Sequence, residues 1–124
     1  MTIIKNKTGH TVTIVAEDDD LNTTVVAAFE PDGKSVTIRT HEHQERLRIG
    51  HVGTSQAGPW WADVADVEYM GLSEDLPRGG FGLAYIVPLQ VALAERRRDF
   101  LVPTDPVYGD DGKRIGFKTL ARIM

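Results

Sequence analysis

The chain has 124 residues, 41% of them hydrophobic and 26% charged, and a net charge of −4 at pH 7. A chain of this size and composition is expected to fold as one domain over residues 1–124, without metal or disulfide cross-links. Its acidic balance argues against general binding to duplex nucleic acid, which needs a strongly basic face.

The sequence also indicates the compartment. There is no cysteine, so disulfides and thiolate chemistry are excluded, as is common in a reducing cytoplasm. No apolar run approaches the ~20 residues of a membrane-spanning helix. The first residues lack the apolar core of a signal peptide. We therefore expect a cytoplasmic protein with no membrane partner.

The first half of the chain is predicted to form strands, because its runs are rich in β-branched residues and separated by turn residues. In the run 11–16, alternation places Val12, Ile14 and Ala16 on one face and Val15 on the other. The predicted strands are residues 2–5, 11–16, 24–30 and 36–40, the last extending to 49 if the polar residues 41–46 continue it.

The second half adds a helix to these strands. Residues 50–59 are predicted to be a mobile loop, because they contain three glycines and a proline. Predicted strands at 63–70 and 83–87 follow, separated by a loop. A helix begins at Pro88, with the arginines 96–98 in its last turn. A hairpin turning at Asp111-Gly112 ends the chain.

These elements predict an α+β fold. We expect a small, mostly antiparallel twisted sheet or partial barrel, with one helix from the C-terminal half packed on it.

Short motifs in a fixed order suggest a family. They are Asn6-x-Thr8-x-His10, Gly71-Leu72, Tyr85-Ile86-Val87, Arg98-Asp99-x-x-Val102-Pro103 and Asp111-Gly112-x-x-Ile115-Gly116. In this order they resemble a family of small, mostly uncharacterised proteins encoded by bacteriophages and by bacteria, notably actinobacteria. Residues 46–67 lie outside the resemblance, and Pro88 stands where the family pattern has a serine helix cap. The resemblance implies a mobile-element setting and brings no established activity.

The cluster Arg96-Arg97-Arg98-Asp99 has two interpretations. Guanidinium groups grip phosphate oxygens bidentately, so the cluster is a candidate anion site. The alternative is a solvent-exposed cationic helix end in which Asp99 pairs with one arginine. Arg78 opens a glycine-rich loop that could contact phosphate, but the loop lacks the Walker lysine and hydroxyl.

Aromatic residues complete the predicted ligand site. Trp60 and Trp61 are adjacent, so on a strand they point to opposite faces, and one of them is free to stack on a base or a partner protein. Asn6, Thr8 and His10 form either a polar site or a capping turn. The predicted ligand-binding residues are Arg78, Arg96, Arg97, Arg98, Trp60, Trp61 and Tyr85.

Histidines offer a metal alternative. On a strand His41 and His43 share a face, and His51 or His10 would have to supply a third ligand. The other interpretation is exposed histidines on a polar strand end. We predict no cofactor and no catalytic residue, because no nucleophile with an evident base is present.

The sequence thus favours a non-enzymatic binding protein of phage or mobile-element type, which sequesters a small anionic, nucleotide-like ligand to counter host defence. One alternative is a protein-binding inhibitor or virion-associated protein without a small ligand. It predicts an exposed apolar patch around Trp60, Trp61 and Phe81, and no deep basic pocket. A second alternative is a small metalloenzyme using His41, His43 and His51. Partners are therefore a small anion or a host protein, with homo-oligomers built through the edge at 36–49.

Overall fold

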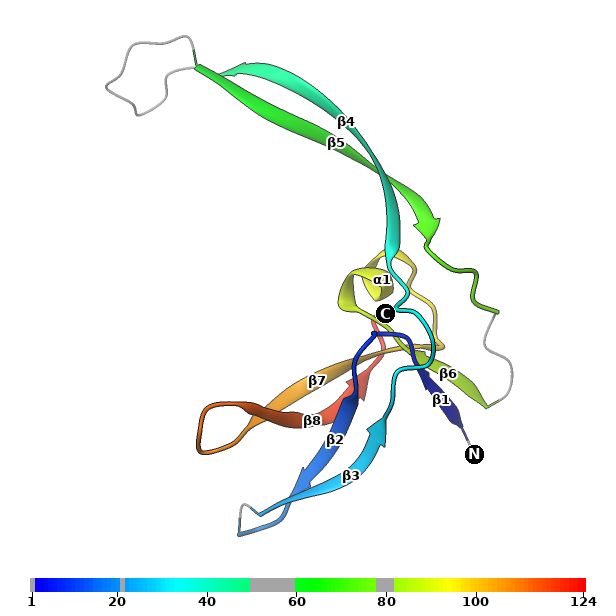
Figure 1. Ribbon diagram of the computed structural model, residues 1–124, viewed down its shortest axis with the longest axis vertical. Helices are drawn as coiled ribbons and strands as arrows, with labels where there is room; N and C mark the ends of the chain where they lie inside the picture. Colours follow the sequence, from blue (N-terminus) through cyan, green and yellow to red (C-terminus); the bar gives the residue numbers. More distant parts are fainter. Residues whose placement is uncertain (1, 21, 50–59, 78–81) are drawn as a thin grey trace. The chain divides into compact units, whose positions relative to one another are not determined.

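A computed structural model describes residues 2–20, 22–49, 60–77 and 82–124. These residues divide into two compact units, Met1–Ile38 with Leu72–Met124, and Arg39–Gly71. The strands and the helix found in them are, in chain order (Figure 1), β1 (Ile3–Asn6), β2 (Val12–Glu17), β3 (Thr23–Phe29), β4 (Ile38–Ile49), β5 (Trp60–Leu72), β6 (Leu83–Ile86), α1 (Leu89–Ala94), β7 (Phe100–Tyr108) and β8 (Arg114–Ala121).

The first unit contains a mixed sheet in the order β1-β6-β7-β8-β2-β3. Its pairs β1–β6, β6–β7 and β2–β8 are parallel, whereas β2–β3 and β7–β8 are antiparallel. The prediction of a β-rich fold with one helix is confirmed, and the sheet is mixed, with parallel pairs beside the antiparallel ones. Antiparallel hairpins form between strands that are neighbours in sequence, whereas the parallel partners come from distant segments and leave no local signal.

The sheet is nearly closed, as expected for a partial barrel. Its two edge strands, β1 and β3, meet where Asn6 forms a bridge with Pro31. The backbone N–H of Asp32 donates to the carbonyl of Asn6 over 2.8 Å. Closure protects strand edges that would otherwise be open to other chains.

The burial of β2 differs from the predicted faces. Val12 and Val15 are both buried, at 1% and 2% exposure, although simple alternation places them on opposite faces. The register with β3 shifts between Ile14 and Val15. The residue without a partner at this shift is Val26, so the extra residue belongs to β3. Along β2, Val15 is buried and Ala16 is exposed.

The helix is shorter than predicted and packs in the core. It ends at Ala94, because Glu95 is extended at φ −127° and ψ 97°, so the arginines 96–98 follow the helix instead of forming its last turn. Pro88 caps its start, and Val91 and Ala92 are buried. The largest core cluster consists of Val36, Tyr85, Val87, Val91, Ala92, Phe100 and Val102.

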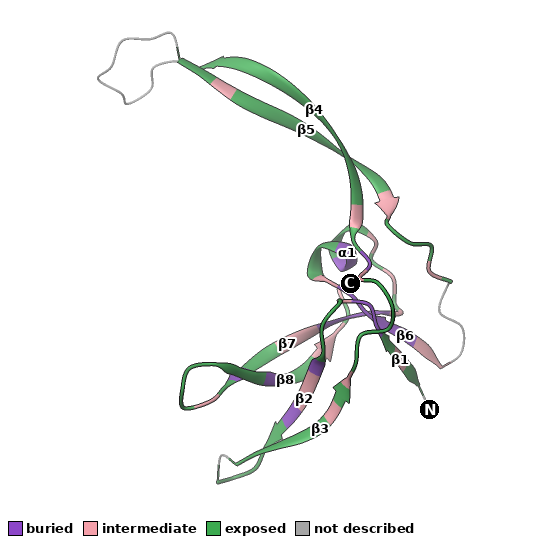
Figure 2. Cartoon of the chain, viewed as in Figure 1, coloured by how far each residue is buried: buried purple, intermediate pink, exposed green. Residues whose placement is uncertain are grey.

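The second unit is a two-stranded sheet of β4 and β5, which run in opposite directions (Figure 1). Figure 2 shows that the two strands are exposed along most of their length. Residues 36–49 were predicted to be strand, and most of them form β4. In the described part of the chain, no helix is long and apolar enough to cross a membrane.

Candidate functional site

The β4–β5 sheet exposes large apolar side chains. Leu47 and Ile49 are 43% and 47% exposed, and Trp60 and Trp61 are 40% and 50% exposed. Val67 is more exposed still, at 58%. Large apolar patches on the surface of monomeric proteins commonly mark binding sites, so the face on which each of these side chains lies is decisive.

Contacts of Arg46 assign the faces of this sheet. The Arg46 guanidinium lies 5.8 Å from the Trp61 ring centre, and its Nε lies 3.8 Å from the Asp63 carboxylate. Arg46, Trp61 and Asp63 therefore share one face. Because side chains alternate along a strand, Leu47, Ile49, Trp60 and Val64 lie on the opposite face. We call these four residues the apolar face of the β4–β5 sheet.

The two strands also differ in charge. β4 carries three arginines against two glutamates, a balance of +1 when its histidines are neutral. β5 carries Asp63, Asp66 and Glu68 and no basic residue, a balance of −3. Each strand of this two-stranded sheet has one edge without a neighbouring strand in the described residues. One edge is thus mildly basic and the other is acidic.

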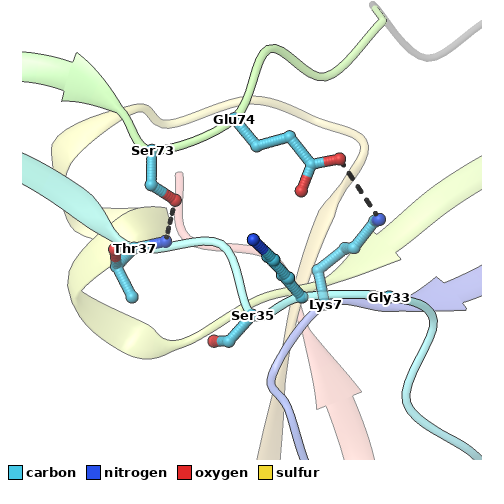
Figure 3. A pocket seen from close by; sticks show the side chains of 7 residues that line it. Lys7, Gly33, Ser35, Thr37, Ser73 and Glu74 are labelled. Atoms are coloured by element: carbon cyan, nitrogen blue, oxygen red, sulfur yellow. Dashed lines mark hydrogen bonds and ion pairs between the residues drawn. The ribbon is translucent and has the colours of Figure 1, made fainter.

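A polar cavity of about 390 Å³ lies in the first unit (Figure 3). It is built where three segments meet, namely the turn after β1, the connection from β3 to β4, and the residues after β5. Hydrogen bonds between Thr37 and Ser73 hold two of these segments together, Thr37 N–H to Ser73 Oγ over 2.9 Å and Ser73 N–H to the Thr37 carbonyl over 2.8 Å. The lining residues are Lys7, Gly33, Lys34, Ser35, Thr37, Ser73 and Glu74.

Lys7 is the buried charge of this cavity. Its side chain is 10% exposed, and its Nζ lies 3.6 Å from Glu74 Oε1 and 3.8 Å from Asp32 Oδ2. In Figure 3 the side chains of Lys7 and Glu74 point toward each other. Lys7 was not among the predicted ligand-binding residues. No local motif around it indicates a cavity, because the other lining residues are distant in sequence.

At the predicted anion site, Arg97 is bonded to other residues of the fold. Arg97 binds the Asp99 carboxylate through two hydrogen bonds, from Nε over 2.9 Å and from an Nη over 2.6 Å. The same guanidinium donates to the Pro77 carbonyl over 2.8 Å and lies 4.5 Å from the Phe100 ring centre. The pairing of Asp99 with one arginine is therefore observed, and Arg97 connects segments of the fold.

The other two arginines do not join Arg97 at a common point. Arg96 donates to the carbonyl of Met124 over 2.8 Å. The Arg98 side chain is exposed, and it forms no ion pair with any carboxylate among the described residues, while its carbonyl accepts a hydrogen bond from Arg122 Nε over 2.7 Å. The three guanidinium groups thus have separate environments.

Two other predicted polar or aromatic positions lie in the interior. Tyr85 is 1% exposed, and its ring packs edge-on against Phe100 at a centroid distance of 6.4 Å. Burial raises the pKa of Tyr85 above its ordinary value of 10.0, and the Asp99 carboxylate raises it further. Tyr85 is therefore a core residue in this structure, without a surface to offer a ligand.

Asn6 is the centre of a capping turn. Its side-chain N–H groups donate to the carbonyls of His10 and Phe29, over 2.7 and 2.8 Å. Its side-chain oxygen accepts hydrogen bonds from the Thr8 N–H and the Thr8 hydroxyl, over 3.0 and 2.6 Å. The motif Asn6-x-Thr8-x-His10 thus fixes the exit of β1 against the end of β3.

The histidines show no metal constellation in the part of the chain that is described. No group of three His, Asp or Glu side chains gathers there in a way that could hold a metal ion. His41 and His43 are exposed on β4. His51 and Arg78, together with Phe81 and the glycine-rich residues 50–59, lie outside the described residues.

Comparison with known protein families, with curated proteins and with solved structures finds no match to this chain. The β4–β5 sheet and the cavity beside Lys7 are therefore the two candidate sites.

Proposed function

We propose that the chain is a non-enzymatic protein-binding protein of phage or mobile-element type, and that the β4–β5 sheet is its binding element. The observation that carries the proposal is the exposed apolar face formed by Leu47, Ile49, Trp60 and Val64. A two-stranded sheet is only marginally stable in water without a third strand or a covering layer. A partner strand beside β4 or β5 supplies the third strand, and it brings its own side chains into contact with the exposed aromatic and aliphatic side chains of the apolar face.

Charge favours a second copy of the chain as this partner. The mildly basic edge of β4 is complementary to the acidic edge of β5, so the β5 edge of one copy fits beside the β4 edge of the next. Such a contact joins two different surfaces, and it therefore produces a ring or a filament instead of a two-fold dimer. Homo-oligomer formation is thus part of the proposal, and binding to a host or virion protein is the alternative outcome.

The arrangement of the arginines supports this function over ligand sequestration by the cluster at 96–98. A phosphate site requires guanidinium groups directed to one point. Arg97 is instead bonded to Asp99 and Pro77, and Arg96 to the chain end at Met124. Sequestration of a nucleotide-like ligand to counter host defence remains a prediction without support from these contacts.

Sedimentation velocity of the full chain over a range of protein and salt concentrations tests the proposal. We expect oligomers that dissociate on dilution and in high salt, because the edge charges are exposed and screened. Leu47→Glu with Trp60→Glu places charges on the apolar face and should yield a monomer. Val67→Glu is the matched control, because it adds a charge to the opposite face of the same sheet.

Hydrogen exchange locates the contact. Amides of β4 and β5 should become more protected as the protein associates, while those of β2 and β3 should not change. A chain that stays monomeric at every concentration, with exchange in β4 and β5 independent of concentration, would exclude the second copy as the partner. Equal association of the double variant and the control would exclude the apolar face.

A further inference from the structure

We propose that the cavity beside Lys7 is a binding site for a phosphate-type oxyanion. This inference is independent of the function proposed for the β4–β5 sheet, because every lining residue belongs to the first unit. None of these residues was among those predicted to bind a ligand.

The hydrogen-bond donors of Lys7 have no short acceptor among the described residues of the protein. A lysine ammonium has three N–H donors and no acceptor. Short charged hydrogen bonds measure about 2.7–2.9 Å between heavy atoms, whereas Nζ of Lys7 lies 3.6 and 3.8 Å from its two carboxylate neighbours. The ammonium still contacts solvent, because no fully buried side-chain nitrogen or oxygen of the described residues lacks a hydrogen-bond partner, but none of its donors has a short protein acceptor. An acceptor inside the cavity would satisfy them.

Other hydrogen-bond donors belong to residues that line the same cavity. Lys34 contributes a second ammonium group to the lining, and Ser35, Thr37 and Ser73 contribute hydroxyls. Because Ser73 Oγ already accepts a hydrogen bond from the Thr37 N–H, the proton of its hydroxyl is available for a ligand oxygen. The lining therefore includes two lysines, one glutamate and three residues with hydroxyl groups, and its donors suit a compact group with several acceptor oxygens.

The volume agrees with such an occupant. About 390 Å³ holds a phosphate group with its waters or the phosphate end of a larger ester, and it lies at the small end of ligand pockets. Inorganic phosphate and a phosphomonoester share this chemistry, so the experiment includes both.

The Glu74 carboxylate distinguishes this site from a general basic patch. Its carboxylate lines the cavity and lies 3.6 Å from Lys7 Nζ, so an arriving oxyanion must compete with it. Neutralising Glu74 should therefore tighten binding of the anion. Its side chain is 46% exposed, so solvent screens the repulsion and the gain should be about twofold to fivefold.

The test is an NMR titration of the full chain at constant ionic strength, first with inorganic phosphate and then with glycerol phosphate. We expect saturable shifts of the amides of Ser35, Thr37 and Ser73. Lys7→Met should weaken binding by about tenfold or more, as expected for the loss of a charged hydrogen bond. Lys34→Ala should weaken it less, because Lys34 is exposed. Glu74→Gln should strengthen binding.

Lys118→Met is the matched control, since it removes a lysine paired with Glu17 on another part of the sheet. If Lys7→Met does not fold, Lys34→Ala and Glu74→Gln still decide the question, because both positions are exposed. Tighter binding of glycerol phosphate would identify an esterified ligand, and equal affinities would identify free phosphate. Shifts that do not saturate, weaker or unchanged binding by Glu74→Gln, or an equal effect of Lys118→Met would overturn the proposal.

Discussion

Replacing Asn6 by alanine should destabilise the fold more than its size suggests. The side chain is buried at 1% exposure and makes four hydrogen bonds, two as donor and two as acceptor. Three of its partner groups are main-chain atoms, namely the carbonyls of His10 and Phe29 and the N–H of Thr8. These groups lose their partner in the variant, and main-chain groups left unpaired away from water are unfavourable.

The expected loss of unfolding free energy follows from these four hydrogen bonds. Each contributes about 0.5–1.5 kcal/mol net, and relaxation around a partly buried turn recovers some of the loss, so we expect about 2–4 kcal/mol. This is a large share of the roughly 5–15 kcal/mol that stabilises a domain. Urea unfolding followed by circular dichroism should show the midpoint falling by about 1–2 M with little change in slope.

Two further variants of this kind test the cause. Asn22→Ala makes the same change at an exposed turn, and it should alter stability by less than about 0.5 kcal/mol. Asn6→Asp keeps the shape but places a carboxylate against the carbonyls of His10 and Phe29, so its stability should rise as pH falls and that carboxylate takes up a proton. If Asn6→Ala and Asn22→Ala unfold at the same urea concentration, the hydrogen bonds of the Asn6 side chain do not stabilise the fold in the way proposed.

Three other predictions concern packing, an ion pair and a buried phenol. Gly116→Ala should lower the thermal midpoint by several degrees, because the added carbon would lie 2.7 Å from a main-chain oxygen of β2; calorimetry that shows no change would contradict this close approach. Arg97→Ala should lower the free energy of unfolding in urea by about 1–3 kcal/mol, because it leaves the largely buried Asp99 carboxylate without its partner. Arg98→Ala should be nearly neutral in the same measurement. The raised pKa of Tyr85 means that its protonated form is favoured by folding, so this contribution is complete below pH 10 and is lost as pH rises through the folded-state pKa. Tyr85→Phe should therefore flatten the alkaline loss of stability in unfolding curves, and an unchanged alkaline slope would contradict the assignment.

Local features of the fold could be predicted from the sequence. The strands expected at 11–16, 24–30 and 83–87 are β2, β3 and β6 within one residue at each end. The hairpin turn at Asp111-Gly112 is also confirmed, with Gly112 at φ 77° and the Gly109 N–H bonded to the Lys113 carbonyl. Each of these signals comes from a few adjacent residues, because turn chemistry and β-branching act locally.

Features that depend on distant segments could not be predicted. The pairing of β1 with β6 joins the first strand to one from the second half of the chain, and no periodicity encodes that choice. The register shift between Ile14 and Val15 also leaves no signal in the sequence, because the residues there alternate as in an ordinary strand. The cavity beside Lys7 has the same origin, because its lining comes from three separate segments.

Adjacency in sequence was a poor guide to the arginines. Arg96 and Arg97 lie in irregular backbone after α1 and Arg98 begins a turn, and the side chains of Arg96 and Arg97 meet different partners. A helix would have kept neighbours within about 5–6 Å on one face only at three- or four-residue spacing. Three consecutive cations therefore specify a local charge and do not specify a site.

A side chain can contribute binding energy when it lacks partners within the folded chain. Arg97, Asn6 and Tyr85 each already hold strands or the core of the first unit together. A group with satisfied partners gains little from a ligand, because binding would first have to break existing hydrogen bonds. Lys7 and the apolar face of the β4–β5 sheet differ in this respect. The donors of Lys7 lack short acceptors among the described residues, and the large side chains of the apolar face remain in water. Binding therefore has most to gain at these two places.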